Sequence, residues 1–187
     1  LLGVPLITSV ALLFAKNVKG VKVISLIGAT IQFVLALTLL YAFHQVRSQG
    51  NSDQMVFQQS YSWFPSLNIN FHVGIDGISV AMIMLTAFVV LAGVLVSWNI
   101  QKMTKEFYFL LIVLSLGAYG FFIALDLFIL FFFLEIAVIP KYLLIGIWGS
   151  GRKEYSANKL ALMLMGGSSL VLVGMLGVYF AGGRSFD

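Results

Sequence analysis

The stretch Asp126–Gly149, DLFILFFFLEIAVIPKYLLIGIWG, decides the fold class of this chain. Residues 127–148 of it are nearly all apolar, and a helix of that length extends about 33 Å. That length is enough to cross the hydrocarbon core of a bilayer, which is about 30 Å thick. Glu135 lies within about one helical turn of the centre of this stretch. The sequence therefore predicts a spanning helix that holds a carboxylate near mid-membrane.

The composition of the whole chain gives the same class. Of its 187 residues, 60% are hydrophobic and 10% are charged, whereas soluble domains carry about a quarter charged residues. This predicts an all-α, polytopic transmembrane bundle of six helices. Their expected ranges are 1–15, 23–46, 73–98, 107–125, 127–148 and 160–181. Residues 47–72 are predicted to be an outer-side connection, and their pattern leaves open a loop or a short hairpin.

The basic residues predict the orientation of this bundle. Loops on one side carry seven of them, and loops on the other side carry two: Lys16, Lys19, Lys22, Lys102, Lys105, Arg152 and Lys153 against Arg47 and Arg184. Loops rich in lysine and arginine face the cytoplasm. The formal charge of +4 is thus explained by membrane orientation, and no nucleic-acid partner is expected.

Several kinds of cofactor site are excluded by residue type. The chain has no cysteine, so it lacks thiolate ligands for zinc or iron–sulfur clusters. It has no glycine-rich nucleotide fingerprint. Its two histidines, His44 and His72, fall at outer ends of predicted segments, which does not suit a pair of haem ligands. No cofactor or metal is expected in this chain.

Glu135 is the first candidate for chemistry. An ionised carboxylate at the centre of a spanning helix costs about 2.5–3.5 kcal/mol on insertion scales. Burial favours the neutral acid, and a nearby lysine favours the ionised form. A lysine that moves closer or further away would therefore unload or load a proton. The structural alternative is a glutamate that only hydrogen-bonds a neighbouring helix.

Two lysines join Glu135 as candidates. Lys141 is six residues further along, which turns it about 120° from Glu135 and places it about 9 Å nearer the Lys-rich side. Lys159 opens the last predicted helix. Each is interpreted either as part of a proton pathway or as a side chain that snorkels to the interface. Pro140 frees the carbonyl of Ile136, which lies beside the acid.

Three stretches now carry a resemblance to a known family. They are FHVGIDGIS (71–79), FFFLEIAVIPKYLLIGIWG (131–149) and YSANKLALMLMGGSSLVL (155–172). In this order they resemble the antiporter-like membrane subunits of respiratory complex I, the proton-pumping NADH:quinone oxidoreductase. Within that group they look most like subunit M.

The resemblance implies an inverted-repeat fold of fourteen helices, of which this chain holds about the first six. It also implies that Glu135 pairs with a lysine on a seventh helix and relays protons. Flavin mononucleotide (FMN), iron–sulfur clusters and quinone are then expected in partner subunits. Lys141 departs from the family, because many relatives carry an uncharged residue there.

Two other functions stay open at this point. The first is a subunit of a multisubunit sodium/proton antiporter or membrane-bound hydrogenase of the same superfamily. The second is a membrane scaffold that binds neighbouring subunits and lipids without moving protons. The expected location is the inner membrane of a bacterium, in preference to that of a mitochondrion.

Overall fold

The computed structural model describes residues 1–49, 55–64 and 69–182. Six helices run through it, and the predicted all-α transmembrane bundle is confirmed. Five helices are long and apolar enough to span a membrane. Their bounds, with the shorter first helix ahead of them, are α1 Gly3–Phe14, α2 Val18–Ser48, α3 Gly77–Val96, α4 Thr104–Ile123, α5 Leu127–Trp148 and α6 Lys153–Ala181.

The helices differ from the predicted ranges mainly where charged residues extend them. α2 begins at Val18 instead of residue 23, and α6 begins at Lys153 instead of residue 160. A search for apolar runs omits such ends, although a helix continues into the polar interface until its hydrogen bonds stop. α4 likewise starts at Thr104 and ends at Ile123. α1 is 12 residues long, which is about 18 Å.

Part of the predicted outer connection forms a β-hairpin. β1 (Val56–Phe64) pairs antiparallel with β2 (Ile69–Ile75). The predicted third helix was therefore wrong at its start, because residues 73–75 belong to β2. Asp76 ends the strand and caps α3, since its side chain accepts a hydrogen bond from the backbone of Ser79. Residues 50–54 and 65–68 of the predicted connection lie outside the described residues.

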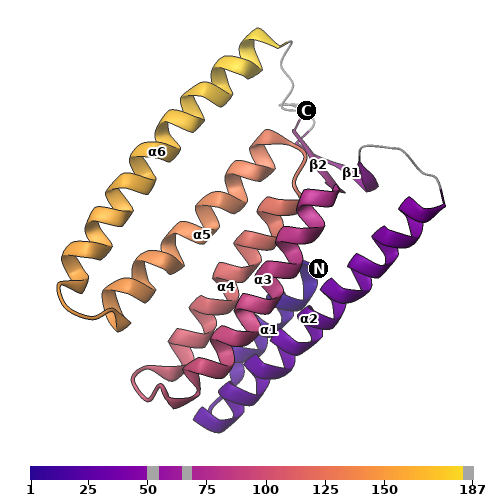
Figure 1. Ribbon diagram of the computed structural model, residues 1–187. Coiled ribbons are helices and arrows are strands. Elements are labelled where there is room, and N and C mark those ends of the chain that lie inside the picture. Colours follow the sequence, from indigo (N-terminus) through magenta and orange to yellow (C-terminus); the bar gives the residue numbers. More distant parts are fainter. Residues whose placement is uncertain (50–54, 65–68, 183–187) are drawn as a thin grey trace.

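The hairpin lies at one end of the bundle, and the connections α1–α2, α3–α4 and α5–α6 lie at the other (Figure 1). Main-chain hydrogen bonds hold β2 to the start of α5, because Leu125 donates to the carbonyl of His72 and Val73 bridges to Ala124. We call this end the hairpin end. The opposite end, formed by connections 15–17, 97–103 and 149–152, is the Lys-rich end.

Side-chain hydrogen bonds join neighbouring elements at the Lys-rich end. Lys105 donates to the Leu13 carbonyl at 2.6 Å, and the Trp148 indole donates to the Lys102 carbonyl at 2.8 Å. The described loops are thus sorted by sides as the charge pattern predicts. Arg184, one of the two basic residues assigned to the other side, lies outside the described residues.

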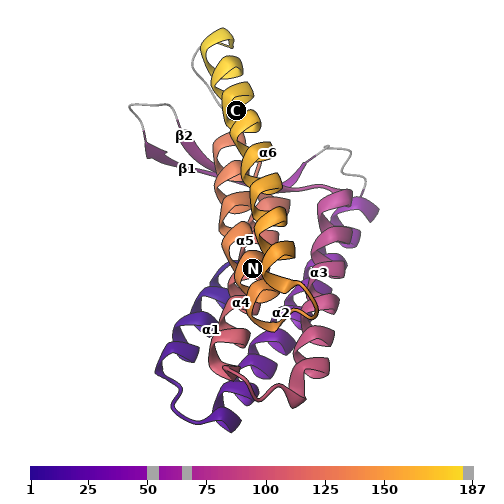
Figure 2. The ribbon, with the colours of Figure 1, turned by 90° about the vertical axis from the view of Figure 1, so that its left-hand side faces the viewer.

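The helices form a layered bundle with α4 near its middle. α4 contacts α1, α2, α3 and α5, while α6 packs mainly against α5. Figure 2 shows α1 on one side of α4 and α3 on the other. Much of the outer surface is apolar, and Val96, Phe14 and Leu170 are each at least 75% exposed. Such a surface suits a bilayer rather than water.

Candidate functional site

Glycines bring α4 and α5 together and thereby fix the rotation of α5. A Cβ atom at Gly117 would lie 2.9 Å from the Ala137 side chain and 3.0 Å from the Phe133 carbonyl. A Cβ at Gly120 would overlap the Phe133 ring. Small residues of this kind allow close helix packing in membranes. Phe133 and Ala137 therefore form the face of α5 that meets α4.

Glu135 lies on the opposite face of α5. Its position on the helix is turned about 160° from both Phe133 and Ala137. Besides α4, the main helix in contact with α5 is α6. Along the axis Glu135 is about 12 Å from the hairpin-end start of α5 and about 20 Å from its Lys-rich end. Its side chain is half-buried. The Oε1 atom is buried and has no hydrogen-bond partner among the described residues.

A polar contact between α5 and α6 sets the level of Glu135 against α6. Tyr142 donates a hydrogen bond to the side-chain oxygen of Asn158 at 3.1 Å. Because the two helices are antiparallel, seven residues back along α5 to Glu135 correspond to about residue 165 on α6. Ser168, which is 8% exposed, lies about one turn from that level. Its hydroxyl donates to the Met165 carbonyl at 3.1 Å.

Ser168, Tyr142 and Asn158 were not candidates from the sequence. The sequence contains features that could have drawn attention to two of them. Ser168 belongs to the small-residue run GGSS, and Tyr142 follows Lys141 directly. The glycines of that run, Gly166 and Gly167, meet nothing within 4 Å among the described residues. They therefore face away from α5, while Ser168 faces it.

Lys141 and Lys159 lie near the site without joining Glu135. Each is exposed, and each is one residue from a member of the Tyr142–Asn158 hydrogen bond. One residue of helix turns each lysine about 100° away from that contact. Within the described ranges, no hydrogen bond or ion pair joins any two of the three candidates Glu135, Lys141 and Lys159. Both lysines lie about 9–11 Å inside the Lys-rich ends of their helices.

Asp126 is a structural carboxylate at the hairpin end of α5. It is fully buried, and one of its oxygens accepts from the backbone of Phe128 at 2.7 Å and of Ile129 at 3.2 Å. This is an N-cap, which satisfies amide groups that the first helical turn leaves free. Asp126 therefore sets where α5 begins, and with it the depth of Glu135.

A second buried polar group lies inside the bundle at a similar depth. Gln32 of α2 is 3% exposed and Tyr119 of α4 is fully buried. The Gln32 amide lies beside the Tyr119 hydroxyl, but neither side chain meets hydrogen-bond geometry among the described residues. Sequence patterns gave no indication of this pair, because it depends on contacts between distant helices.

The described residues contain no cluster of side chains suited to hold a metal ion. In the ranges 1–49, 55–64 and 69–182, no three histidine, aspartate or glutamate side chains gather where they could hold an ion. The arrangement around Glu135 instead offers one buried carboxylate oxygen, with hydroxyl and amide groups on the same helix pair. A carboxyl group of this kind can form hydrogen bonds and can exchange a proton with a suitable partner.

The comparisons with known proteins point to one group of membrane subunits. The family described as NADH:quinone oxidoreductase/Mrp antiporter, TM matches residues 124–187. The NAD(P)H-quinone oxidoreductase chain 4 2 of Synechococcus elongatus is 36% identical over 181 residues, which is 95% of this chain and 33% of that relative. The chain thus spans about a third of the length of the curated relatives it matches.

Chains in two solved membrane complexes have a fold similar to that of this chain. A chain of respiratory complex I from Thermus thermophilus with bound NADH aligns over 99% of this chain and 36% of its own length, with a TM-score of 0.82 and 22% identity. A chain of the Mrp complex from Dietzia sp. DQ12-45-1b aligns over 98% of this chain and 19% of its own length, with a TM-score of 0.77 and 16% identity. Both likenesses concern the fold.

Proposed function

Because this chain belongs to the antiporter-like membrane subunits of the NADH:quinone oxidoreductase and Mrp antiporter group, we propose that it serves in a proton-translocating subunit of an NADH:quinone oxidoreductase. The proposed activity is that of a whole subunit, and this chain covers about a third of the length of the relative it matches. In this proposal the subunit carries out no electron transfer. It couples quinone reduction elsewhere in the complex to proton movement through the membrane.

Glu135 carries the proposal. Its carboxylate lies near the middle of α5, and its Oε1 atom is buried without a partner among the described residues. An unpaired carboxylate in a medium of low polarity is stabilised by taking up a proton or by the approach of a cation. Glu135 would hold a proton until a lysine approaches, and would release it when the lysine stabilises the charged form.

The lysine partner and the rest of the route are also proposals. The resemblance to complex I implies that the partner lies on a seventh helix, in a part of the protein that this chain does not include. Lys141 and Lys159, on the Lys-rich half of α5 and α6, are the candidates for the section of route between Glu135 and that membrane surface. Ser168, about one helical turn from the level of Glu135, is proposed as a further polar group beside the route.

The partners and cofactors follow from the same assignment. We expect neighbouring membrane subunits in a hetero-oligomer, with FMN, iron–sulfur clusters and quinone bound in partner subunits. The absence of cysteine from the chain supports this for the clusters, whose ligands are thiolates. We place the protein in a bacterial inner membrane, with the Lys-rich end toward the cytoplasm.

The test is Glu135→Gln in the full-length protein in its native membranes. Glutamine keeps the shape and removes the titratable group. Assembly is checked first, and then NADH–quinone activity and proton pumping are measured together. We expect assembly to persist and both activities to collapse. Glu154→Gln, at the exposed first turn of α6, is the matched control and keeps both activities. If Glu135→Gln retains both, the subunit is a scaffold in this respect and the proposal fails.

A second function is favoured by the likeness to the Mrp complex. The fold matches that structure with a TM-score of 0.77, so the subunit would then serve in a multisubunit sodium/proton antiporter. Purification of the native complex separates the two functions. Flavin and iron–sulfur subunits that co-purify support the oxidoreductase, while their absence together with monovalent cation exchange supports the antiporter.

A further inference from the structure

A groove of about 350 Å³ opens between α1, α4 and α5 at the Lys-rich end, away from Glu135. In Figure 2, α1 lies to the side of α4 opposite α3. Most residues that line the groove are apolar. They come from all three helices and from the connection before α4: Leu13, Met103, Phe109, Leu110, Leu143 and Ile147. Because α4 and α5 are long and apolar enough to span a membrane, the apolar part of the groove between them and α1 opens toward the interior of the bilayer.

One basic residue lines this groove, and two more lie close in sequence to residues of its lining. Lys105 lines it, and its ammonium group donates to the Leu13 carbonyl at 2.6 Å. Lys16, three residues after Leu13, and Lys102, directly before Met103, are both exposed. Glu106 is the single carboxylate that lines the groove. Lys105 and Glu106 balance within the lining, and the exposed Lys16 and Lys102 on the adjoining connections make this end of the groove positive.

The rim beside these lysines is held in place. The Trp148 indole donates to the Lys102 carbonyl at 2.8 Å and packs edge-to-face on the Phe107 ring, with 5.3 Å between ring centroids. Tryptophan with one polar edge satisfied favours the level of lipid headgroups. The apolar part of the groove therefore lies below the headgroup level, and the lysines lie at it.

We propose that this groove binds an anionic phospholipid. One acyl chain lies along the apolar wall formed by α1, α4 and α5, and the phosphate lies at Lys105, with Lys16 and Lys102 beside it. A cationic mouth over an apolar groove at a membrane surface recognises an amphiphile with a negative headgroup. A neutral lipid would fill the same wall without using the lysines, and a helix of a partner subunit would not need them.

The experiment is native mass spectrometry of the full-length subunit, titrated with phosphatidylglycerol or with phosphatidylcholine. We expect phosphatidylglycerol to bind with the higher affinity. Lys105→Ala weakens its binding about five-fold, since one lysine near a membrane surface contributes about 1 kcal/mol. Glu106→Gln strengthens it, because the one opposing charge at the mouth is removed. Leu110→Trp fills the groove and removes the bound lipid.

Matched variants on other faces separate this site from general attraction to lipid. Lys19→Ala removes an exposed lysine from the same membrane end, on α2, and leaves binding unchanged. Leu85→Trp enlarges a side chain that is 55% exposed on α3 and also leaves it unchanged. Equal affinity for the two lipids overturns the proposal. So does an effect of Lys19→Ala as large as that of Lys105→Ala, or a cross-link from Leu110→Cys to a polypeptide in the native complex.

Discussion

The Tyr142 hydroxyl of α5 donates a hydrogen bond to the side-chain oxygen of Asn158 on α6, with 3.1 Å between the two oxygens. α6 packs mainly on α5, and this bond joins the two helices in the half nearer their Lys-rich ends. Tyr142 is also on the face of α5 that carries Glu135, seven residues away. The bond therefore fixes which residues of α6 lie at the level of the acid.

Removal of this bond should loosen α6. Hydrogen bonds between membrane helices contribute about 0.6 kcal/mol on average. We expect Tyr142→Phe and Asn158→Ala each to destabilise the bundle, and the double variant to cost less than the sum of the two by about that amount. A double-mutant cycle on unfolding in denaturing detergent measures this coupling. Additive effects would show that the bond does not form in the membrane.

The close approach of α4 and α5 predicts a sharp difference between two glycines. Gly117→Ala places a Cβ against the Phe133 carbonyl and the Ala137 side chain, and main-chain atoms cannot move aside independently. We expect a loss of about 1–3 kcal/mol in the free energy of unfolding, as for other overpacked sites.

Gly166→Ala is the matched control, because its Cβ would meet nothing within 4 Å among the described residues. Alanine also has the higher helix propensity, so this variant should unfold no more easily than the wild type. The measurement is detergent unfolding followed by circular dichroism. An equal loss in both variants would contradict the packing described for α4 and α5.

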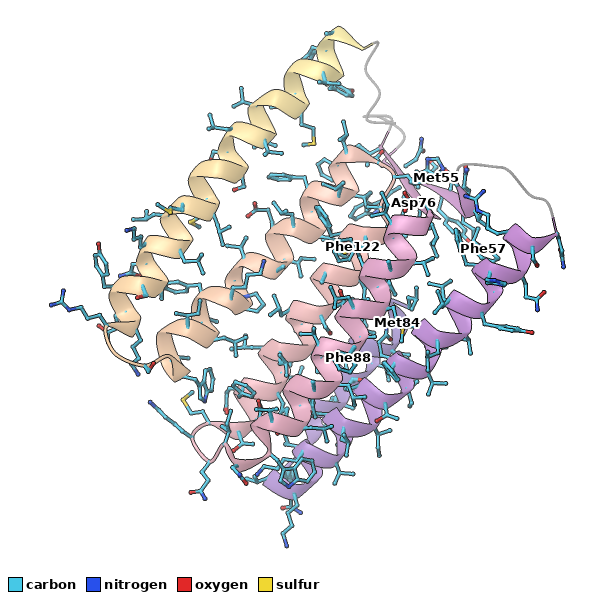
Figure 3. All side chains as sticks on the ribbon, viewed as in Figure 1. Met55, Phe57, Asp76, Met84, Phe88 and Phe122 are labelled. Atoms are coloured by element: carbon cyan, nitrogen blue, oxygen red, sulfur yellow. The ribbon has the colours of Figure 1, made fainter. Side chains whose placement is uncertain are left out.

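Asp76 gives a pH-dependent prediction at the hairpin end, where β2 passes into α3 (Figure 3). Its carboxylate accepts from the Ser79 backbone at 2.7 Å, and this hydrogen bond lowers the pKa of Asp76 below its ordinary value of 3.8. The stabilisation is therefore fully present above pH 3.8, and it is lost as the pH falls through the lower pKa of the folded state.

The two variants of Asp76 separate charge from capping. Asp76→Ala should cost about 1 kcal/mol at neutral pH, because α3 loses its N-cap. Asp76→Asn keeps an effective cap but removes the titration, so its stability should change less than that of the wild type between pH 7 and pH 3. Unfolding curves at the two pH values measure both effects. A wild type that loses no more than Asp76→Asn over this range would contradict the assignment.

The sequence predicts α5 well because its apolar run has clear limits. Asp126 supplies the cap, and the helix occupies the predicted residues 127–148. α2 and α6 differ because their first turns are charged, at Lys19 and Lys153, and these residues belong to the helix although they lie outside the apolar run. Hydropathy measures the part of a helix that lies in hydrocarbon, and backbone hydrogen bonds extend beyond it.

The hairpin and the surroundings of Glu135 depend on contacts that local patterns do not contain. β1 and β2 are recognisable as strands only through their pairing, such as Tyr61 with Phe71. The sequence predicts that Glu135 lies near mid-membrane. The close contact of Gly117 on α4 fixes the direction in which Glu135 points from α5. The contact of α6 with α5 fixes the level of Ser168 relative to Glu135. Each of these requires the packing of two helices to be known.

The last prediction concerns the two candidate lysines. Lys141 is exposed on α5 about 10 Å inside its Lys-rich end, where a cation in contact with hydrocarbon is costly. Lys159 lies at a comparable depth on α6. The helix begins with Lys153 and Glu154, directly after Arg152, so its end is in polar surroundings and the Lys159 ammonium can snorkel outward. If Lys141 carries protons toward the Lys-rich surface, its removal should slow turnover more than removal of Lys159.

We expect Lys141→Met to lower NADH–quinone activity and proton pumping together by at least about ten-fold; a positioned proton-transfer group typically contributes about 100-fold to 10,000-fold. Lys159→Met should retain more than half of both rates. The measurement uses full-length protein in native membranes with assembly verified, and Lys19→Met controls for the loss of one positive charge at the same end. Wild-type rates in Lys141→Met would remove Lys141 from the route and leave Glu135 as its single candidate on α5.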